Sequence, residues 1–137
     1  MDVTAGGPDR PDHSIWPALA YQDPAAMRRW LLALGFVEGI VLPGEAEGEI
    51  HHSEMLWPEG GRVTVSSTGT REAGFDTPPG AVGLHVVTDD PDRVHARAVA
   101  LDAPIVRPLV DQSDYQSRDF SVRDPEGNIW TFATYGG

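Results

Sequence analysis

A chain of 137 residues, of which 40% are hydrophobic and 23% are charged, is expected to fold as one globular domain with its own core. It has no cysteine and no lysine, which excludes disulfides, thiolate metal ligands, thiol nucleophiles and Schiff-base chemistry on a side chain. The formal net charge of −11 argues against nucleic acid and anionic membranes as partners. No apolar run approaches the roughly 20 residues of a membrane-spanning helix, and the N-terminus has no secretory-signal pattern. We therefore expect a cytoplasmic protein with a mobile tail at residues 1–12.

After that tail, the first half of the chain predicts a strand, a helix and three more strands. Asp23 and Pro24 are the N-cap and N1 residues typical of a helix start. The apolar residues that follow at helical spacing are Met27, Trp30, Leu31 and Leu34. The strands are expected at 14–21, 35–42, 49–57 and 62–67. A Pro-Glu-Gly-Gly turn at 58–61 joins the last two strands as a hairpin.

The second half repeats this pattern with an offset of 67 residues, which takes Asp23 to Asp90 and Leu34 to Leu101. Its strands are expected at 81–88, 103–110, 117–123 and 128–134. We therefore predict a single domain over residues 13–137. Its parts are two βαβββ modules at 13–67 and 81–135 and a Gly-, Pro- and Thr-rich linker at 68–80.

These segments resemble the vicinal oxygen chelate superfamily, also called the glyoxalase/bleomycin-resistance fold. The resemblance covers the chain after the tail and is strongest at 114–132, where a DPEGN turn lies between an F-x-V strand and an aromatic strand. It implies an α+β fold in which two βαβββ repeats form a cupped mixed sheet with the helices on the outer face. It also implies that two units, from one chain or across a homodimer, enclose a small-molecule ligand.

Metal-dependent members of this family use four ligands, one from the first and one from the last strand of each unit. Carried onto this sequence, the four positions are Trp16, Thr64, Gly83 and Thr131. None is an imidazole or a carboxylate, the groups expected of a catalytic transition-metal site. The resemblance is therefore to the drug-binding members that lack the metal, and we predict no metal and no other cofactor.

The segment EIHHSEM supports an alternative. Adjacent strand residues point to opposite faces, so only one of His51 and His52 can face the cup, and Glu54 shares a face with His52. His85, on the first strand of the second unit, is expected to face the cup as well. His52, Glu54 and His85 could then form a 2-His-1-carboxylate site for Zn, Ni, Fe or Mn, or a metal-free acid/base group. The plainer interpretation is that they are pocket-lining or surface polar residues.

Two functions are compatible with these residues. The first is a metal-free protein that binds a hydrophobic or aromatic small molecule, such as an antibiotic or a metabolite, in a dimeric cup. The alternative is a glyoxalase-like enzyme of lyase, isomerase or dioxygenase type, with His85, His52 and Glu54 as candidate catalytic residues. The residues expected to line the ligand site are Trp16, His52, Trp57, Thr64, Ser66, His85, Tyr115 and Thr131.

Three of these residues have a second interpretation. Trp16 either stacks on a planar ligand or packs in the core. Trp57 either borders the pocket or is half-buried structure. Tyr115 either bonds a ligand at the lip of the cup or contacts a dimer partner. Trp130 and Phe132 alternate with Thr131 and are expected to pack under a helix.

Overall fold

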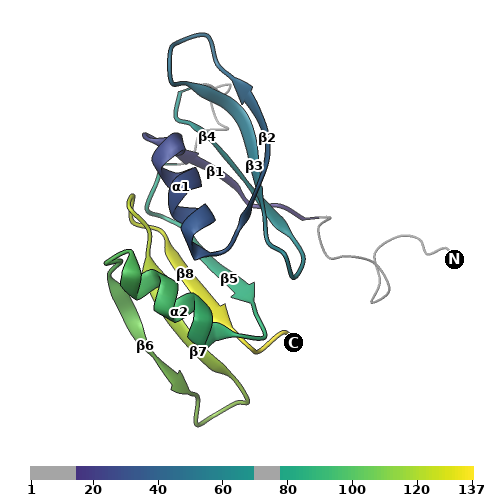
Figure 1. Ribbon diagram of the computed structural model, residues 1–137, viewed down its shortest axis with the longest axis vertical. Helices are drawn as coiled ribbons and strands as arrows, with labels where there is room; N and C mark the ends of the chain where they lie inside the picture. Colours follow the sequence, from purple (N-terminus) through teal and green to yellow (C-terminus); the bar gives the residue numbers. More distant parts are fainter. Residues whose placement is uncertain (1–14, 70–77) are drawn as a thin grey trace, which may run out of the picture.

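The computed structural model describes residues 15–69 and 78–137, which form two modules of one helix and four strands each (Figure 1). In chain order the elements are β1 (Ala18–Tyr21), α1 (Pro24–Leu34), β2 (Val37–Pro43), β3 (Ile50–Leu56), β4 (Arg62–Ser67), β5 (Gly83–Val87), α2 (Pro91–Ala100), β6 (Ile105–Asp111), β7 (Arg118–Arg123) and β8 (Ile129–Ala133). The predicted tail at 1–12 and residues 70–77 of the predicted linker lie outside the described residues. Within the described ranges, no helix is long and apolar enough to cross a membrane.

Each module forms one mixed sheet, and the strand order is the same in both. The orders are β1-β4-β3-β2 and β5-β8-β7-β6, with the first strand parallel to the last and the other pairs antiparallel. Ala18 lies opposite Thr64 in the first sheet, and His85 lies opposite Thr131 in the second. These two pairs differ by the same 67 residues. The internal repeat and the predicted α+β fold of two βαβββ units, with the helices outside, are therefore confirmed.

The helices begin where the sequence predicts. Asp23 Oδ1 accepts a hydrogen bond from the Ala26 N–H at 3.1 Å, and Asp90 Oδ1 accepts one from the Arg93 N–H at 3.1 Å. Helix α1 ends at Gly35, whose φ of 118° lies in the left-handed region that glycine adopts without a steric cost. Local capping chemistry therefore sets the ends of these elements.

The largest difference from the predicted strand boundaries is at β1; the other strand ends lie within two residues of their predicted positions. Strand β1 begins at Ala18, not at residue 14. Pro17 has no N–H with which to extend the ladder toward β4, although its carbonyl still accepts from the Thr64 N–H at 3.0 Å. Residues 15–17 therefore approach the sheet without being part of it.

The two modules share one hydrophobic core. The rings of Trp30 on α1 and Trp130 on β8 have centroids 6.2 Å apart, and those of Trp57 and Phe132 are 5.8 Å apart. Trp130 and Phe132 are fully buried, as their alternation with Thr131 predicts. The aromatic side chains of one module thus complete the core of the other.

Each Pro-Glu-Gly turn also binds the segment that leads into the helix of the other module. Glu126, in the β7–β8 turn, accepts hydrogen bonds from the backbone N–H groups of residues 22–23, both at 2.8 Å. Glu59, in the β3–β4 turn, accepts from the Thr88 hydroxyl at 2.8 Å and from the Asp89 N–H at 2.7 Å. The two glutamates occupy the same position of the repeat, so the contact between modules is reciprocal.

Replacing Glu126 by alanine is expected to lower the free energy of unfolding by about 1 to 2 kcal/mol, because two hydrogen bonds to a carboxylate are lost at a partly covered site. Urea unfolding followed by circular dichroism measures the change. Glu47→Ala, at an exposed position, is the matched control and should alter stability by less than about 0.5 kcal/mol. Equal midpoints for the two variants would show that the turn does not hold the modules together.

The DPEGN turn that carries the family resemblance has a structural role here. Asp124 is 3% exposed and accepts four hydrogen bonds. Two come from the N–H groups of Glu126 and Asn128, and two from the Tyr21 hydroxyl at 2.8 Å and the Trp130 indole at 2.9 Å. Burial and the adjacent Asp124 carboxylate raise the pKa of Tyr21 far above its ordinary value, so Tyr21 remains a neutral donor. The motif thus joins β1 of one module to the last hairpin of the other.

Candidate functional site

The polar residues predicted for the cup lie on the sheet faces that the helices leave uncovered. On β3, Ser53 and Met55 are fully buried on the side of α1. His52 and Glu54 alternate with them and point to the opposite face. The strand at 49–57 therefore presents His52 and Glu54, as a pair, to the helix-free face.

On that face, the side chains of His52, Glu54 and Arg62 form a short hydrogen-bonded series. His52 Nε2 donates to Glu54 Oε2 at 2.9 Å, and Arg62 Nη1 donates to Glu54 Oε1 at 2.8 Å. The Arg62 guanidinium also lies over the Trp16 ring, 4.7 Å from its centroid. The hydrogen bonds from His52 and Arg62 hold the pKa of Glu54 below its usual range, so Glu54 is a carboxylate that orients the His52 ring and the Arg62 guanidinium.

Two predicted hydroxyl residues lie next to this chain on β4. Thr64 pairs with Glu54 in the register of the sheet, and Ser66 follows two residues later on the same face. Both side chains are at least nine-tenths buried, and the Oγ atoms of both lack a hydrogen-bond partner among the described residues. Buried hydroxyls are usually paired, so this face has spare donors and acceptors.

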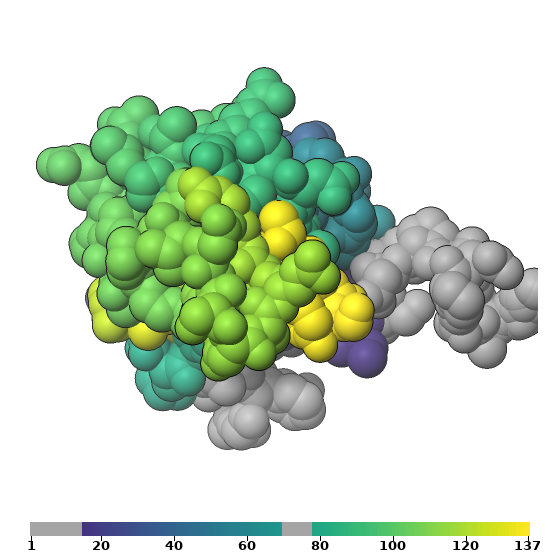
Figure 2. All heavy atoms as spheres, turned by 90° about the horizontal axis from the view of Figure 1, so that it is seen from below, coloured from purple at the N-terminus to yellow at the C-terminus, as the bar shows by residue number. Residues whose placement is uncertain are grey.

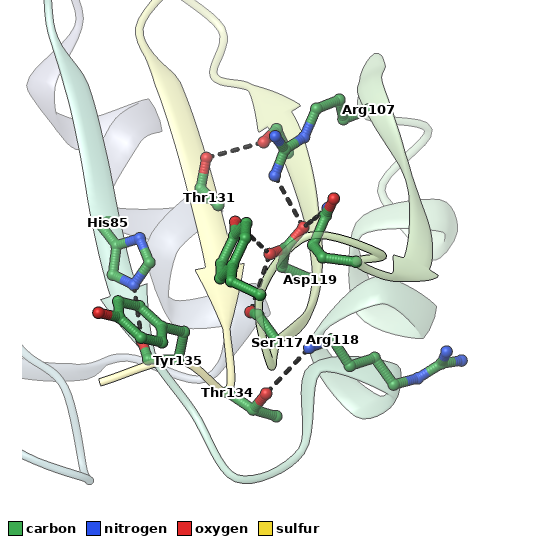
Figure 3. Close-up of polar contacts among 11 residues, drawn as sticks. His85, Arg107, Ser117, Arg118, Asp119, Thr131, Thr134 and Tyr135 are labelled. Atoms are coloured by element: carbon green, nitrogen blue, oxygen red, sulfur yellow. Dashed lines mark hydrogen bonds and ion pairs between the residues drawn. The ribbon is translucent and has the colours of Figure 1, made fainter. Parts of the chain in front are cut away.

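The second module carries a different polar group at the equivalent position, around the fully buried Asp119 (Figure 3). Its carboxylate accepts from Arg107 Nη2 at 2.7 Å, Gln112 Nε2 at 2.7 Å, Ser117 Oγ at 2.9 Å and Tyr115 Oη at 3.3 Å. Burial alone would raise the pKa of Asp119, but these hydrogen bonds and the Arg107 charge lower it below the usual range. Asp119 is therefore an ionised anchor that orders the β6–β7 loop.

Replacing Asp119 by asparagine is expected to lower the free energy of unfolding at pH 7 by about 2 to 3 kcal/mol, because donors that faced a carboxylate then face an amide. Since the folded-state pKa is lowered, the stability that Asp119 contributes is present above the unfolded-state pKa of about 3.9 and is lost as the pH falls. The difference between wild type and variant should therefore shrink below about pH 4. Urea unfolding at several pH values measures it, with the exposed Asp114→Asn as control. A difference that does not change with pH would contradict this assignment.

Two further predicted residues lie beside the C-terminus. His85 Nε2 is 2.9 Å from the Tyr135 carbonyl oxygen and donates to it, as Figure 3 shows. The Tyr115 ring meets the Tyr135 ring edge-on at 5.5 Å. In Figure 2 the yellow C-terminal residues accordingly lie against the yellow-green loop around residue 115. Thr131 forms a hydroxyl pair with Ser121 at 2.7 Å.

The residues present do not fit a metal site. The four inherited positions hold an indole, two hydroxyls and a glycine, which are poor ligands for a catalytic transition metal. Over residues 15–69 and 78–137, no group of three His, Asp or Glu side chains is placed to hold a metal ion. The alternative set of His52, Glu54 and His85 is therefore not brought together. His52 and Glu54 form a pair, but they belong to the first sheet and His85 to the second.

An open cavity of about 590 Å³ lies between the modules. Trp57 and residues 59–63, which run from the end of β3 through its turn into β4, form one side, and Val82 with strand β5 forms the other. Phe36 and Trp130 complete its aromatic part. Trp57 lines the cavity and is 8% exposed, and its indole Nε1 donates to the Val87 carbonyl at 2.9 Å. Of the predicted ligand-site residues, Trp57 and His85 meet here.

The two sides of the contact between modules differ at repeat-related positions. The 67-residue offset relates Tyr21 to Thr88, and Asn128 to Gly61. On one side, the Tyr21 hydroxyl receives a hydrogen bond from Asn128 Nδ2 at 2.9 Å. On the other side, Gly61 lines the cavity and Thr88 lines a second hollow of about 240 Å³. The side-chain contact between Tyr21 and Asn128 therefore has no equivalent there.

The chain was compared with known proteins. No family model and no curated protein matches it. Among solved structures, TioX from Micromonospora sp. ML1 is 34% identical, the match covers 89% of this chain and 97% of that one, and the TM-score is 0.73. A glyoxalase/bleomycin resistance protein from Streptomyces sp. CB03234 is 18% identical over 84% of this chain and 94% of that one, with a TM-score of 0.66. A member of the glyoxalase/bleomycin resistance protein/dioxygenase superfamily from Sphaerobacter thermophilus DSM 20745 is 18% identical, and the match covers 88% of this chain and 96% of that one. The TM-score is 0.65.

The fold defines a protein built from two βαβββ modules with the same strand order. The chain belongs to the glyoxalase/bleomycin resistance protein/dioxygenase superfamily, the vicinal oxygen chelate superfamily that its sequence resembles.

Proposed function

We propose that this protein binds a hydrophobic or aromatic small molecule without the help of a metal, and that the ligand occupies the cavity between the modules. The cavity itself carries the proposal. Its volume of about 590 Å³ is that of a site for a drug-sized molecule, and the indole of Trp57 and the rings of Phe36 and Trp130 supply flat apolar walls. His85 and Arg62 supply polar groups at its border.

The chemistry of the cavity favours an uncharged or cationic aromatic ligand. Three aromatic side chains line it, and the chain carries a net charge of −11, which attracts cations from solution. The hydrogen-bonded series of His52, Glu54 and Arg62 lies on the helix-free face of the first sheet. The partly exposed side chains of His52 and Arg62 offer additional hydrogen bonds to a ligand that extends out of the cavity.

We also propose that two copies of the chain form a homodimer through β2 and β6. β2 and β6 are the outermost strands of their sheets, and both expose consecutive apolar residues. Because consecutive strand residues alternate faces, both faces of these strands are uncovered. The exposed residues are Val37, Ile40, Val41, Leu42, Ile105, Val106 and Val110. Sedimentation velocity should give the mass of two chains for the wild type and of one chain for Ile40→Arg with Val41→Arg. A monomeric wild type would contradict the dimer.

A thermal-shift screen of planar aromatic compounds, including cationic antibiotics, tests the binding function. A ligand at 100 times its dissociation constant should stabilise the folded protein by about 2.7 kcal/mol. The same compound should quench tryptophan fluorescence in the wild type and less in Trp57→Phe. If no compound in the screen stabilises the protein, the binding proposal fails.

The His52–Glu54 pair supports one alternative, a metal-free enzyme. A carboxylate 2.9 Å from an imidazole orients the ring as an acid/base group must be oriented, and the His52 side chain is 34% exposed. In that case His52→Ala should abolish turnover of a bound compound while its affinity largely survives. An equal loss of both would assign His52 to binding.

A further inference from the structure

Strand β5 has one free edge, and that edge borders the cavity. β5 is the outermost strand of its sheet, and among residues 15–69 and 78–137 it pairs only with β8 (Figure 1). Every residue from Val82 to Val87 lines the cavity, which the turn of the first module closes from the other side. An unpaired strand edge presents a row of backbone donors and acceptors. Here that row lies at the wall of a cavity of ligand size.

The register of the sheet shows which backbone groups point to the cavity. The Val82 carbonyl accepts from the Ile129 N–H at 3.0 Å, and the Thr88 N–H donates to the Ala133 carbonyl at 2.9 Å, so the even-numbered residues point to β8. Backbone groups alternate sides along a strand, so those of Gly83, His85 and Val87 point to the free edge. The hydrogen bond from the Trp57 indole to the Val87 carbonyl confirms this direction.

Most of these groups have no partner in the chain. Apart from the Trp57–Val87 bond, no hydrogen bond to the N–H or C=O of Gly83, His85 or Val87 is found on this edge in the described part of the chain. The Trp57 indole also closes the edge at Val87. The free segment is therefore only about three residues long, which suits a short molecule rather than a strand of a partner protein.

At Gly83 strand β5 carries no side chain, although the fold does not require a glycine there. A Cβ built at Gly83 would meet no heavy atom within 4 Å, and Gly83 is not among the residues with positive φ. Neither packing nor backbone conformation calls for glycine there. A glycine inside a strand often marks a place where another backbone or a ligand comes close. This observation is independent of the unpaired edge and points to the same site.

We propose that the ligand is peptide-like, with consecutive amides in an extended conformation that pair with the backbone of Gly83 and His85. Its N–H groups would donate to the carbonyls of these residues, and its carbonyls would accept from their N–H groups, as an added strand does. An aromatic side chain of the ligand would then reach the rings of Trp57 and Phe36. This inference rests on the proposed binding function, since it assigns a chemical class to the ligand of the same cavity.

A library of N-acetylated, C-amidated tripeptides with Phe, Tyr or Trp at the centre tests the proposal against the wild-type protein. Each peptide is compared by fluorescence titration or calorimetry with its analogue N-methylated at the central amide, which has the same apolar groups but one donor fewer. At least one peptide should bind, and N-methylation should weaken it about tenfold. In ¹⁵N-labelled protein, that peptide should shift the backbone amides of Gly83, His85 and Val87.

Two variants of His85 distinguish the contribution of its backbone N–H to peptide binding from that of its side chain. His85→Ala keeps the N–H and removes only the side chain, so it is the reference for the second variant. His85→Pro removes an N–H that makes no ladder bond, which an edge strand tolerates, and should weaken binding about tenfold relative to His85→Ala. Equal affinities for the peptide and its N-methyl analogue, or no binder in the library, would overturn the inference. If aromatic compounds that are not peptides still stabilise the protein, the binding function stands and only the ligand class is wrong. If they do not, both fail.

Discussion

Replacing Asp124 by alanine is expected to lower the free energy of unfolding by about 3 to 5 kcal/mol, the largest loss of stability predicted for a single side chain here. The carboxylate is 3% exposed and satisfies four donors, two of its own turn and two from Tyr21 and Trp130. Its removal leaves these four donors without that acceptor at a largely buried site. It also breaks the only contact through which the Tyr21 hydroxyl meets a charged group among the described residues.

Urea unfolding measures this effect, with Asp114→Ala in the exposed β6–β7 loop as the matched control. The control should change stability by less than about 0.5 kcal/mol. Tyr21→Phe is informative as a second variant, because it removes one of the four donors and should cost about 1 kcal/mol. A loss below about 1 kcal/mol for Asp124→Ala would show that the DPEGN turn does not organise the contact between modules.

Replacing Gly83 by phenylalanine is expected to weaken ligand binding by about 10- to 100-fold while the fold is retained. The new side chain starts at the wall of the cavity, where a Cβ meets nothing within 4 Å, so the folded protein accommodates it. It then occupies space that the ligand needs. An aromatic residue also has a higher strand propensity than glycine, so the melting temperature should not fall.

The measurement is a fluorescence titration of both proteins with the compound that stabilises the wild type most. Ala81→Phe is the matched control, since Ala81 is exposed, two residues away and not part of the cavity lining. The control should bind as the wild type does. Unchanged affinity of Gly83→Phe, with a normal melting curve, would place the ligand elsewhere in the protein.

The sequence predicts most of the fold because the signals are local. The Asp-Pro pairs at 23–24 and 90–91 cap both helices in the structure. Residues that are 67 positions apart in the sequence also occupy the same register positions in the two sheets. Period-two alternation also predicts correctly that His52 and Glu54 share a face. The error at β1 is local too, since Pro17 ends the ladder earlier than the apolar pattern suggests.

The site is only partly visible in the sequence. The alternation of side chains along a strand predicts which polar residues share a face. The cavity, however, lies between two segments, at 57–63 and 82–87, and nothing in either segment indicates that they meet. Trp57 illustrates this: as a strand-end residue it has two interpretations, and the structure shows it both buried in the core and lining the cavity.

His95 is a further case in which a sequence interpretation is incomplete. Its place beside two arginines on α2 suggests a solvated side chain, but its ring meets Phe120 edge-on at 5.0 Å. A helix position next to charged residues can still cover the core, because exposure depends on the sheet beneath the helix and not on sequence neighbours. The same limit applies to His85, whose imidazole is directed to the C-terminal Tyr135 carbonyl and not to His52 and Glu54.

The most direct test of ligand binding in the cavity is an isotope-filtered NOE measurement on methyl-labelled protein with the most stabilising compound bound. Aromatic protons of the compound should show NOEs to the methyl groups of Val63, Leu84 and Val86, which line the cavity. Thr64 on β4 and Thr131 on β8 lie outside the cavity lining. NOEs confined to the methyl groups of these two residues would contradict the account and place the ligand on the sheets outside the cavity.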